Sequence, residues 1–386
     1  PTFEADFTKL CRTNGFFRLN GKLWIEDCAF NGVDILRGDG RIHASFSKTN
    51  SAVTIDRLFV FRREGHAKGE LTSDFMRSLI SFKGESTMDP KALARIIGVF
   101  EDELIDKFEI NGSCKIAAEG TVGCNNMDLT DFKASVESRG LELAGFVTDR
   151  CVFDMHMTGI TNTLSDIQGS IYDGDFSGSA RFMLPCGDRT NVSYIAEGVL
   201  QEAKLQKLIA ARLEEPDKDL QGRLFARVKV GGLIGEGQGH TATGEGEIKI
   251  KDGHVFRFPL LGGFTAIITK IIPGLDFVLS QSDAKAEVDI SDGQIYSKEI
   301  LIEGDVLSLN GRGHYDLNGN LSFRVQARLM KEHTLVGKLL QALTYPISSL
   351  LEFRLRGTLD NPEWYPINFS KELLRKLGLK NKEDVM

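Results

Sequence analysis

The chain has 386 residues with a formal net charge of −7, and it contains 40 glycines, 9 prolines and 25 phenylalanines. This length exceeds that of a usual single domain, so we expect two modules or an elongated body. The acidic balance excludes nucleic acid as a partner, because the sequence contains no strong local basic patch to offset it.

Alternating apolar and polar residues run along most of the chain and predict about 15 to 20 strands. Successive side chains of a strand point to opposite faces, so each such strand gives a sheet one apolar and one charged face. Asn-Gly and Asp-Gly motifs supply the positive φ angles of tight hairpin turns. They lie at 19–23, 30–35, 38–42, 251–255, 291–295 and 317–321.

Helical periodicity interrupts this pattern in four places. Asp89 and Pro90 form a good N-cap and first turn for a helix near 89–108. The others are expected at 201–215, 260–272 and 334–353, where prolines end or kink the last two.

A faint internal repeat divides the chain. The first two predicted helices are each followed by a glycine turn and then strands, which favours two related strand-helix modules. We expect a first β-groove module at 1–190, a second at 191–370 and a basic C-terminal helix or tail at 371–386.

An open antiparallel sheet of this many strands must curl. Curling with the apolar face inward predicts a long, open groove, and such a groove can hold acyl chains without specific polar contacts. The predicted lining consists of Val288, Ile290, Leu321, Phe323, Val325, Leu329, Phe153, Met155 and Val228.

The two apolar helical segments at 260–272 and 334–353 allow two interpretations. They pack on the groove as core or end-cap, or they contact a bilayer or plug the lipid path. The residues concerned are Phe264, Ile267, Ile268, Ile271, Leu339 and Leu340.

Motifs for catalysis, cofactors or metals are not found in the sequence. The glycine loop at 235–239 is not followed by a helix, as a nucleotide-binding fingerprint requires. We therefore expect no enzyme activity, no cofactor and no metal. Six cysteines lack metal-ligand spacing, and Cys114 and Cys124 either pair across neighbouring strands or remain free thiols.

The stretch 244–277, followed by 284–329, resembles the C-terminal region of the AsmA-like family, which includes the TamB-type proteins. Gly311, Gly313 and Asp316 fit the family's glycine turn before a final alternating strand, and the segment 356–370 resembles its usual ending. The likeness is clearest over about half of the chain, and upstream segments share its strand-then-helix rhythm.

This resemblance implies a taco-like β-groove in the periplasm that is tethered to the inner membrane and carries phospholipid or another acyl lipid in support of outer-membrane biogenesis. Envelope proteins would be its partners. The chain begins at Pro1 without a membrane anchor, so we expect the anchor in a segment absent from it. The alternative function is a β-rich scaffold or adhesin whose sheets bury each other and whose outer face binds protein.

Overall fold

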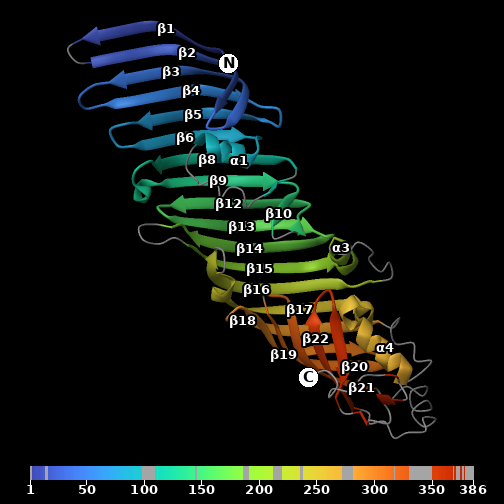
Figure 1. The fold of residues 1–386 in the computed structure, drawn as a ribbon. Coiled ribbons are helices and arrows are strands. Elements are labelled where there is room, and N and C mark those ends of the chain that lie inside the picture. Colours follow the sequence, from blue (N-terminus) through green and yellow to red (C-terminus); the bar gives the residue numbers. More distant parts are fainter. Residues whose placement is uncertain are drawn as a thin grey trace. The chain divides into compact units, whose positions relative to one another are not determined.

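The structure is a computed structural model that describes residues 2–13, 16–97, 109–110, 112–143, 146–185, 191–211, 220–234, 238–271, 281–316, 318–329, 350–367, 369–370, 374–375 and 378. Most of these residues form strands, and twenty strands belong to one sheet (Figure 1). Neighbouring strands run antiparallel, and the sheet does not close on itself. The prediction of a mainly β chain with a large antiparallel sheet and few helices is therefore confirmed.

The strands of the first half are β1 (Thr2–Thr13), β2 (Phe16–Phe30), β3 (Val33–Phe46), β4 (Ser51–Phe61), β5 (His66–Asp74), β6 (Leu79–Ser86), β7 (Glu109–Ile110), β8 (Cys114–Gly123), β9 (Asp131–Ser138), β10 (Leu141–Leu143), β11 (Phe146–Val147), β12 (Arg150–Thr158), β13 (Thr161–Ile171) and β14 (Gly174–Met183). Those of the second half are β15 (Val192–Lys204), β16 (Arg223–Ile234), β17 (Thr243–Gly253), β18 (Ser282–Ser291), β19 (Gln294–Gly304), β20 (Leu307–Asp316), β21 (Asn320–Leu329), β22 (Leu350–Thr358) and β23 (Pro362–Pro366). The short β7, β10 and β11 form a separate three-stranded sheet.

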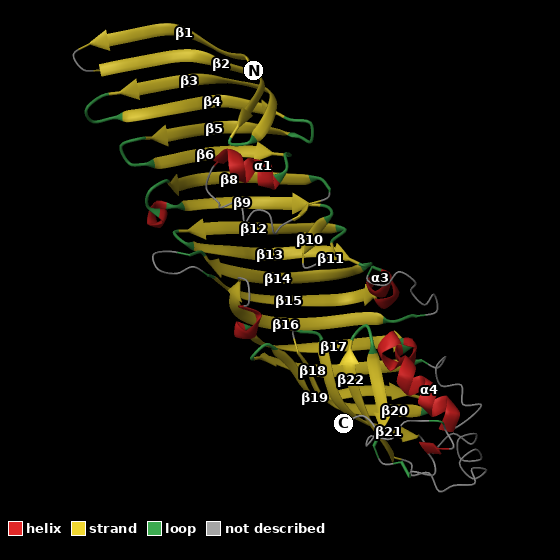
Figure 2. Ribbon diagram, viewed as in Figure 1, coloured by secondary structure: helices red, strands yellow, loops and turns green. Residues whose placement is uncertain are grey.

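Figure 2 shows how few helices accompany these strands. The described helices are α1 (Pro90–Ile97), α3 (Leu205–Ala210) and α4 (Gly262–Ile271) with the 3-10 turns η1 (Met127–Leu129), η2 (Gln238–Thr241), η3 (Val255–Arg257) and η4 (Pro259–Leu261).

Contacts divide the chain into two compact units. Unit 1 comprises Pro1–Ile171 and Ser177–Val192, and unit 2 comprises Tyr172–Phe176 and Ser193–Met386. The start of β14 thus belongs to unit 2, because Gly174 lies directly against Ala203 of β15. The chain passes between the units three times, and the boundary predicted at 190–191 lies close to the third passage, between Val192 and Ser193.

Three of the six glycine motifs are not hairpin turns. Asn31 and Gly32, with φ of 47° and 74°, form the expected turn between β2 and β3, and Asp292 and Gly293 do the same between β18 and β19. The motifs at 19–23 and 38–42 instead lie inside the long strands β2 and β3, and the one at 251–255 leads into η3. At Gly40 the glycine serves close packing, since a Cβ there would lie 2.9 Å from Ile55 Cγ2.

The predicted helices differ in how much of each is described. Asp89 caps α1 as expected, because its Oδ1 accepts a 3.0 Å hydrogen bond from the Lys91 amide. The segment 98–108 lies outside the described residues. The helix predicted from 201 begins only at Leu205, because β15 continues through Lys204.

The prediction of a helix at 334–353 is wrong at its C-terminal end. Leu350–Thr358 is the strand β22, paired with β21. Leu351 and Phe353 are both buried, which is the period of two that a strand requires. The rest of the segment, with Leu339 and Leu340, lies outside the described residues, as does most of 371–386.

Of the two alternatives for Cys114 and Cys124, the structure shows the free thiols. Cys114 opens β8, and Cys124 directly follows the end of the same strand, so the two thiols lie at opposite ends of it. Both are free, as are Cys28 and Cys151.

Candidate functional site

Unit 1 has a sheet with one apolar and one charged face. Across β4, β5, β6, β8, β9 and β12, directly paired residues share a face and form rows that cross the strands. On the charged face, Lys68 and Glu85 approach to 3.0 Å and Lys83 and Glu119 to 2.8 Å. The hydrogen bond from Lys83 lowers the pKa of the Glu119 carboxyl, as expected for a paired surface group.

Three rows make up the apolar face. A middle row consists of Leu58, Gly69, Gly84, Ala118, Ala134 and Met155. A first flanking row consists of Ile55, Leu71, Phe82, Gly120, Phe132 and Met157, and a second flanking row of Val60, Ala67, Ser86, Ile116, Val136 and Phe153. The middle row therefore has glycine or alanine on four successive strands, between two rows of mostly larger side chains.

The glycines of the middle row are required by the backbone. A Cβ on Gly69 would lie 2.3 Å from the Lys83 carbonyl oxygen, and one on Gly84 would lie 2.7 Å from that of Lys68. β5 and β6 therefore approach each other at a point where only glycine fits. The same requirement leaves the apolar face without side chains at these two positions.

Helix α1 covers one end of this face. Val33, Ile35 and Val60 of the sheet pack with Met88 and Ala92 in a buried cluster. Since Val60 belongs to the second flanking row, α1 lies on the apolar side.

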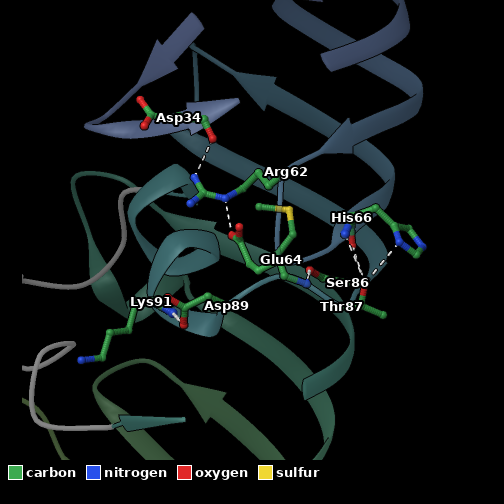
Figure 3. A network of polar contacts seen from close by, with 9 residues as sticks. Asp34, Arg62, Glu64, His66, Ser86, Thr87, Asp89 and Lys91 are labelled. Atoms are coloured by element: carbon green, nitrogen blue, oxygen red, sulfur yellow. Dashed lines mark hydrogen bonds and ion pairs between the residues drawn. The ribbon is translucent and has the colours of Figure 1, made fainter. Parts of the chain in front are cut away.

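Polar contacts hold the segment that leads into α1 (Figure 3). Ser86 Oγ accepts a 3.0 Å hydrogen bond from the Met88 amide, and the Thr87 amide donates to the His66 carbonyl at 2.8 Å. Nearby, Arg62 donates to the Asp34 carbonyl at 2.7 Å and pairs with Glu64. The cover is thus fixed to β5 and β6 by directional bonds as well as by packing.

A second cluster covers the other end of the face. Val122, Phe132 and Met157 are buried there, and Met127 of η1 and Leu184 pack against them. Between the two covered ends, Leu71, Ile116, Ala118, Val136 and Phe153 are only half-buried. This band of half-buried apolar side chains is the candidate site.

A row of buried groups borders the band. Cys114 of β8 pairs with Ser138 of β9, which pairs in turn with Cys151 of β12. All three side chains are less than 5% exposed. Burial, and to a lesser degree the charge of Asp89, raises the pKa of Cys114 to about 11. Burial also raises the pKa of Cys151, so both thiols are protonated at neutral pH and are poor nucleophiles.

A hollow of about 590 Å³ lies on the opposite, charged face. Most of its lining comes from charged-face positions such as Lys68, Lys115 and Glu137, and Ala118 and Ala134 of the middle row do not line it. Four residues of the second flanking row also contribute to the lining: Ser86, Ile116, Val136 and Phe153. Three carboxylates of the lining have partners, namely Glu85 with Lys68, Glu137 with Arg150, and Asp154, which accepts a 2.6 Å hydrogen bond from Ser135. We therefore interpret this hollow as a solvent-filled surface groove between rows of side chains. Phe153 borders it, and is the one predicted lining residue that does.

Unit 2 covers its apolar face more completely. Helix α4 buries Phe264, Ile267, Ile268 and Ile271 against the sheet. Of the two alternatives for segment 260–272, this arrangement corresponds to packing as part of the core. Phe264 packs edge-to-face on Phe353 at 5.1 Å between ring centroids.

The predicted lining residues of unit 2 fall into two groups. Leu321, Val325 and Leu329 are at most 6% exposed inside the α4 cluster, with Phe323 at its border, so the protein itself covers them and they do not line an open surface. Val288 and Ile290 are half-buried, and Val228 is 39% exposed.

In unit 1, Phe153 and Met155 lie on the apolar face as predicted from their alternation, but sequence reasoning did not single out Ile116, Ala118 or Val136. The same alternation at 114–122 and 132–138 marks them. Only the strand register shows that Ala118 joins a row of small residues on four strands, with Ile116 and Val136 in the row beside it.

Metal sites and membrane-spanning helices are two further kinds of functional feature. The described part of the chain contains no group of three or more His, Cys, Asp or Glu side chains placed to hold a metal ion. In the same part, no helix has both the length and the apolar character needed to cross a bilayer.

Comparison with protein-family models, with curated proteins and with solved structures finds no match to this chain.

Proposed function

We propose that the chain is a non-enzymatic lipid-binding protein and that the half-buried band of unit 1 holds acyl chains. The observation that carries the proposal is the middle row, in which Gly69, Gly84, Ala118 and Ala134 follow one another across four strands between rows of mostly larger apolar side chains. A linear apolar ligand fits along such a row, because small residues leave room above the backbone.

The dimensions suit an acyl chain. Six strands spaced about 4.8 Å apart give the row a length of about 24 Å. That exceeds the roughly 15 Å hydrocarbon depth of one bilayer leaflet. Each buried methylene contributes about 0.8 kcal/mol, so affinity arises without a specific polar contact.

The resemblance to the AsmA-like family supports a wider setting for this activity. We propose a curved β-groove in the periplasm, anchored through a segment absent from this chain, that moves phospholipid between membranes together with envelope proteins. The scaffold alternative is less favoured, because helices rather than a second sheet cover the apolar faces in the described residues.

The test is native mass spectrometry of the chain purified from membranes, with extraction and counting of bound lipid. Ala118→Phe places a large ring in the middle row and should abolish most of the bound lipid. Ala117→Phe is the matched control, since Ala117 is the next residue, is exposed and faces the charged side. It should leave the lipid content unchanged.

The proposal fails if the wild-type chain carries no acyl lipid, or if both phenylalanine variants retain it equally. Far-UV circular dichroism of both variants shows whether the sheet is intact.

A further inference from the structure

The tip of the β5–β6 hairpin, residues 75–78, exposes two large apolar side chains. Phe75 is 56% exposed and Met76 is 57% exposed. Both belong to a four-residue turn between the paired strands β5 and β6, so they lie at the end of a hairpin and not on a flat sheet face.

Aromatic rings connect this tip to the apolar face. Phe75 stacks on Phe46 at 6.3 Å, and Phe46 lies 6.0 Å from Phe17. Phe46 lies on the same face of β3 as Ile42, which pairs with Ile55 of the first flanking row, and Phe17 pairs with Phe46 in the β2–β3 ladder. The strand ends that carry the β3–β4 and β5–β6 turns lie at the left of Figure 1. Leu129 of η1, which is 48% exposed, lies on this side of unit 1.

Three backbone amides of the tip are hydrogen-bonded within the protein. The Phe75 amide donates to the Ser51 carbonyl at 2.8 Å, and Asp74 Oδ1 accepts from the amides of Met76 and Arg77 at 2.9 and 3.1 Å. A loop that enters hydrocarbon must satisfy its own amide groups, because no water is present there to do so. This turn meets that condition at all three positions.

Cationic side chains stand beside the apolar ones. The Arg77 side chain is 77% exposed and lies 3.9 Å from Asp74, whose side chain is 29% exposed. Lys48, in the neighbouring β3–β4 turn, is also exposed. The acidic Asp128 next to Leu129 is exposed too, so the positive character is centred on the β3–β4 and β5–β6 turns.

We propose that the β5–β6 tip is a membrane-contact site that inserts Phe75 and Met76 at the surface of an anionic bilayer, with Arg77 and Lys48 at the headgroup phosphates. A bilayer suits this feature better than a protein partner, because it takes in projecting apolar tips and pairs with flanking cations. This role is separate from lipid binding on the apolar face. It would place the β3–β4 and β5–β6 turns of unit 1 against a membrane.

The experiment is co-flotation of the full chain with vesicles of phosphatidylcholine alone or mixed with phosphatidylglycerol. We expect wild type to float with the vesicles, more strongly when phosphatidylglycerol is present. Phe75→Ser/Met76→Ser should lower the partition coefficient at least about tenfold, since two large apolar groups no longer enter the interface. Arg77→Ala should reduce the preference for phosphatidylglycerol.

Phe30→Ser is the matched control. Phe30 is 52% exposed and ends β2 at the β2–β3 hairpin, so it lies at the other end of the strands from the β5–β6 tip. This variant should float like wild type. Phe75→Trp keeps the tip apolar and should show a blue-shifted added emission on vesicles, which reports insertion of that residue directly.

Three outcomes would overturn the proposal: wild type that stays in solution with both vesicles, a double variant that floats like wild type, or equal loss in Phe30→Ser. A chain that carries bound lipid yet does not float overturns this inference alone and leaves the proposed function standing.

Discussion

The apolar faces of the two units differ in what covers them. In unit 2, α4 and the turns before it bury the strands β20 to β23 in one cluster with three aromatic rings at its centre. In unit 1, among the residues that the structure describes, α1 and η1 cover the two ends of the face, and most apolar residues between them are half-buried. The same alternating pattern thus produces a closed core in one unit and an accessible apolar surface in the other.

The largest expected effect comes from placing a charge on each face. Val325→Asp buries a carboxylate under α4 and should destabilise unit 2 by more than about 3 kcal/mol. Val136→Asp alters a half-buried residue in unit 1 and should cost about 1 kcal/mol while removing bound lipid. Denaturant unfolding measures both effects on stability, monitored by Trp364 in a Trp24→Phe background for unit 2 and by Trp24 in a Trp364→Phe background for unit 1.

Trp364 is a suitable reporter because its Nε1 donates to the Leu260 carbonyl at 2.8 Å within the α4 cluster. Equal destabilisation by the two aspartates would mean that the faces are equally closed, and the comparison between the units would be lost.

A smaller effect is expected at the cap of α1. Asp89→Ala removes the acceptor for the Lys91 amide and should cost about 1 kcal/mol. We expect faster hydrogen exchange in α1 and more exposure of the surface beneath it. Asp89→Asn keeps a capping oxygen without the charge, so hydrogen exchange close to wild type is the expected control result. If alanine and asparagine behave alike, the side-chain cap does not hold the cover.

The smallest effect is chemical and leaves the fold unchanged. Because burial raises the pKa of Cys114 to about 11, its thiolate is scarce at about pH 8 and its alkylation should be slow. Its reactivity should increase as the pH approaches that pKa. Cys124 is exposed and should react with iodoacetamide in the folded chain. Peptide mass mapping measures both sites, and rapid labelling of Cys114 would show that its end of the apolar face is open to solvent.

The alternation of apolar and polar residues was enough to predict the strands and their two faces. Phe153 and Met155 are examples, because side-chain direction in a strand follows from position alone. What covers each face was not predictable, since it depends on contacts between segments far apart in the chain. Val325 and Val136 both lie in alternating strands, yet among the described residues only Val325 packs in a cluster with a helix.

Glycine motifs predicted hairpin turns correctly only where the motif does not lie inside a long paired strand. Asn31 and Gly32 form the hairpin that their residue types favour, whereas the motif at 38–42 continues as β3 because β2 and β4 pair with it on both sides. The middle row was missed for a related reason. Its members are scattered from Leu58 to Met155 and meet only through strand register.

The last strand of the sheet has a further consequence. β23 pairs with β22 through the alternate residues Glu363 and Tyr365, and the Ile367 amide continues this pattern by donating to Glu352. The backbone nitrogens of Pro362, Trp364 and Pro366 therefore face away from β22, and two of these three carry no hydrogen. An incoming strand would find a single donor along this border. Such an edge is a poor template for strand addition, which guards the molecule against end-to-end aggregation there.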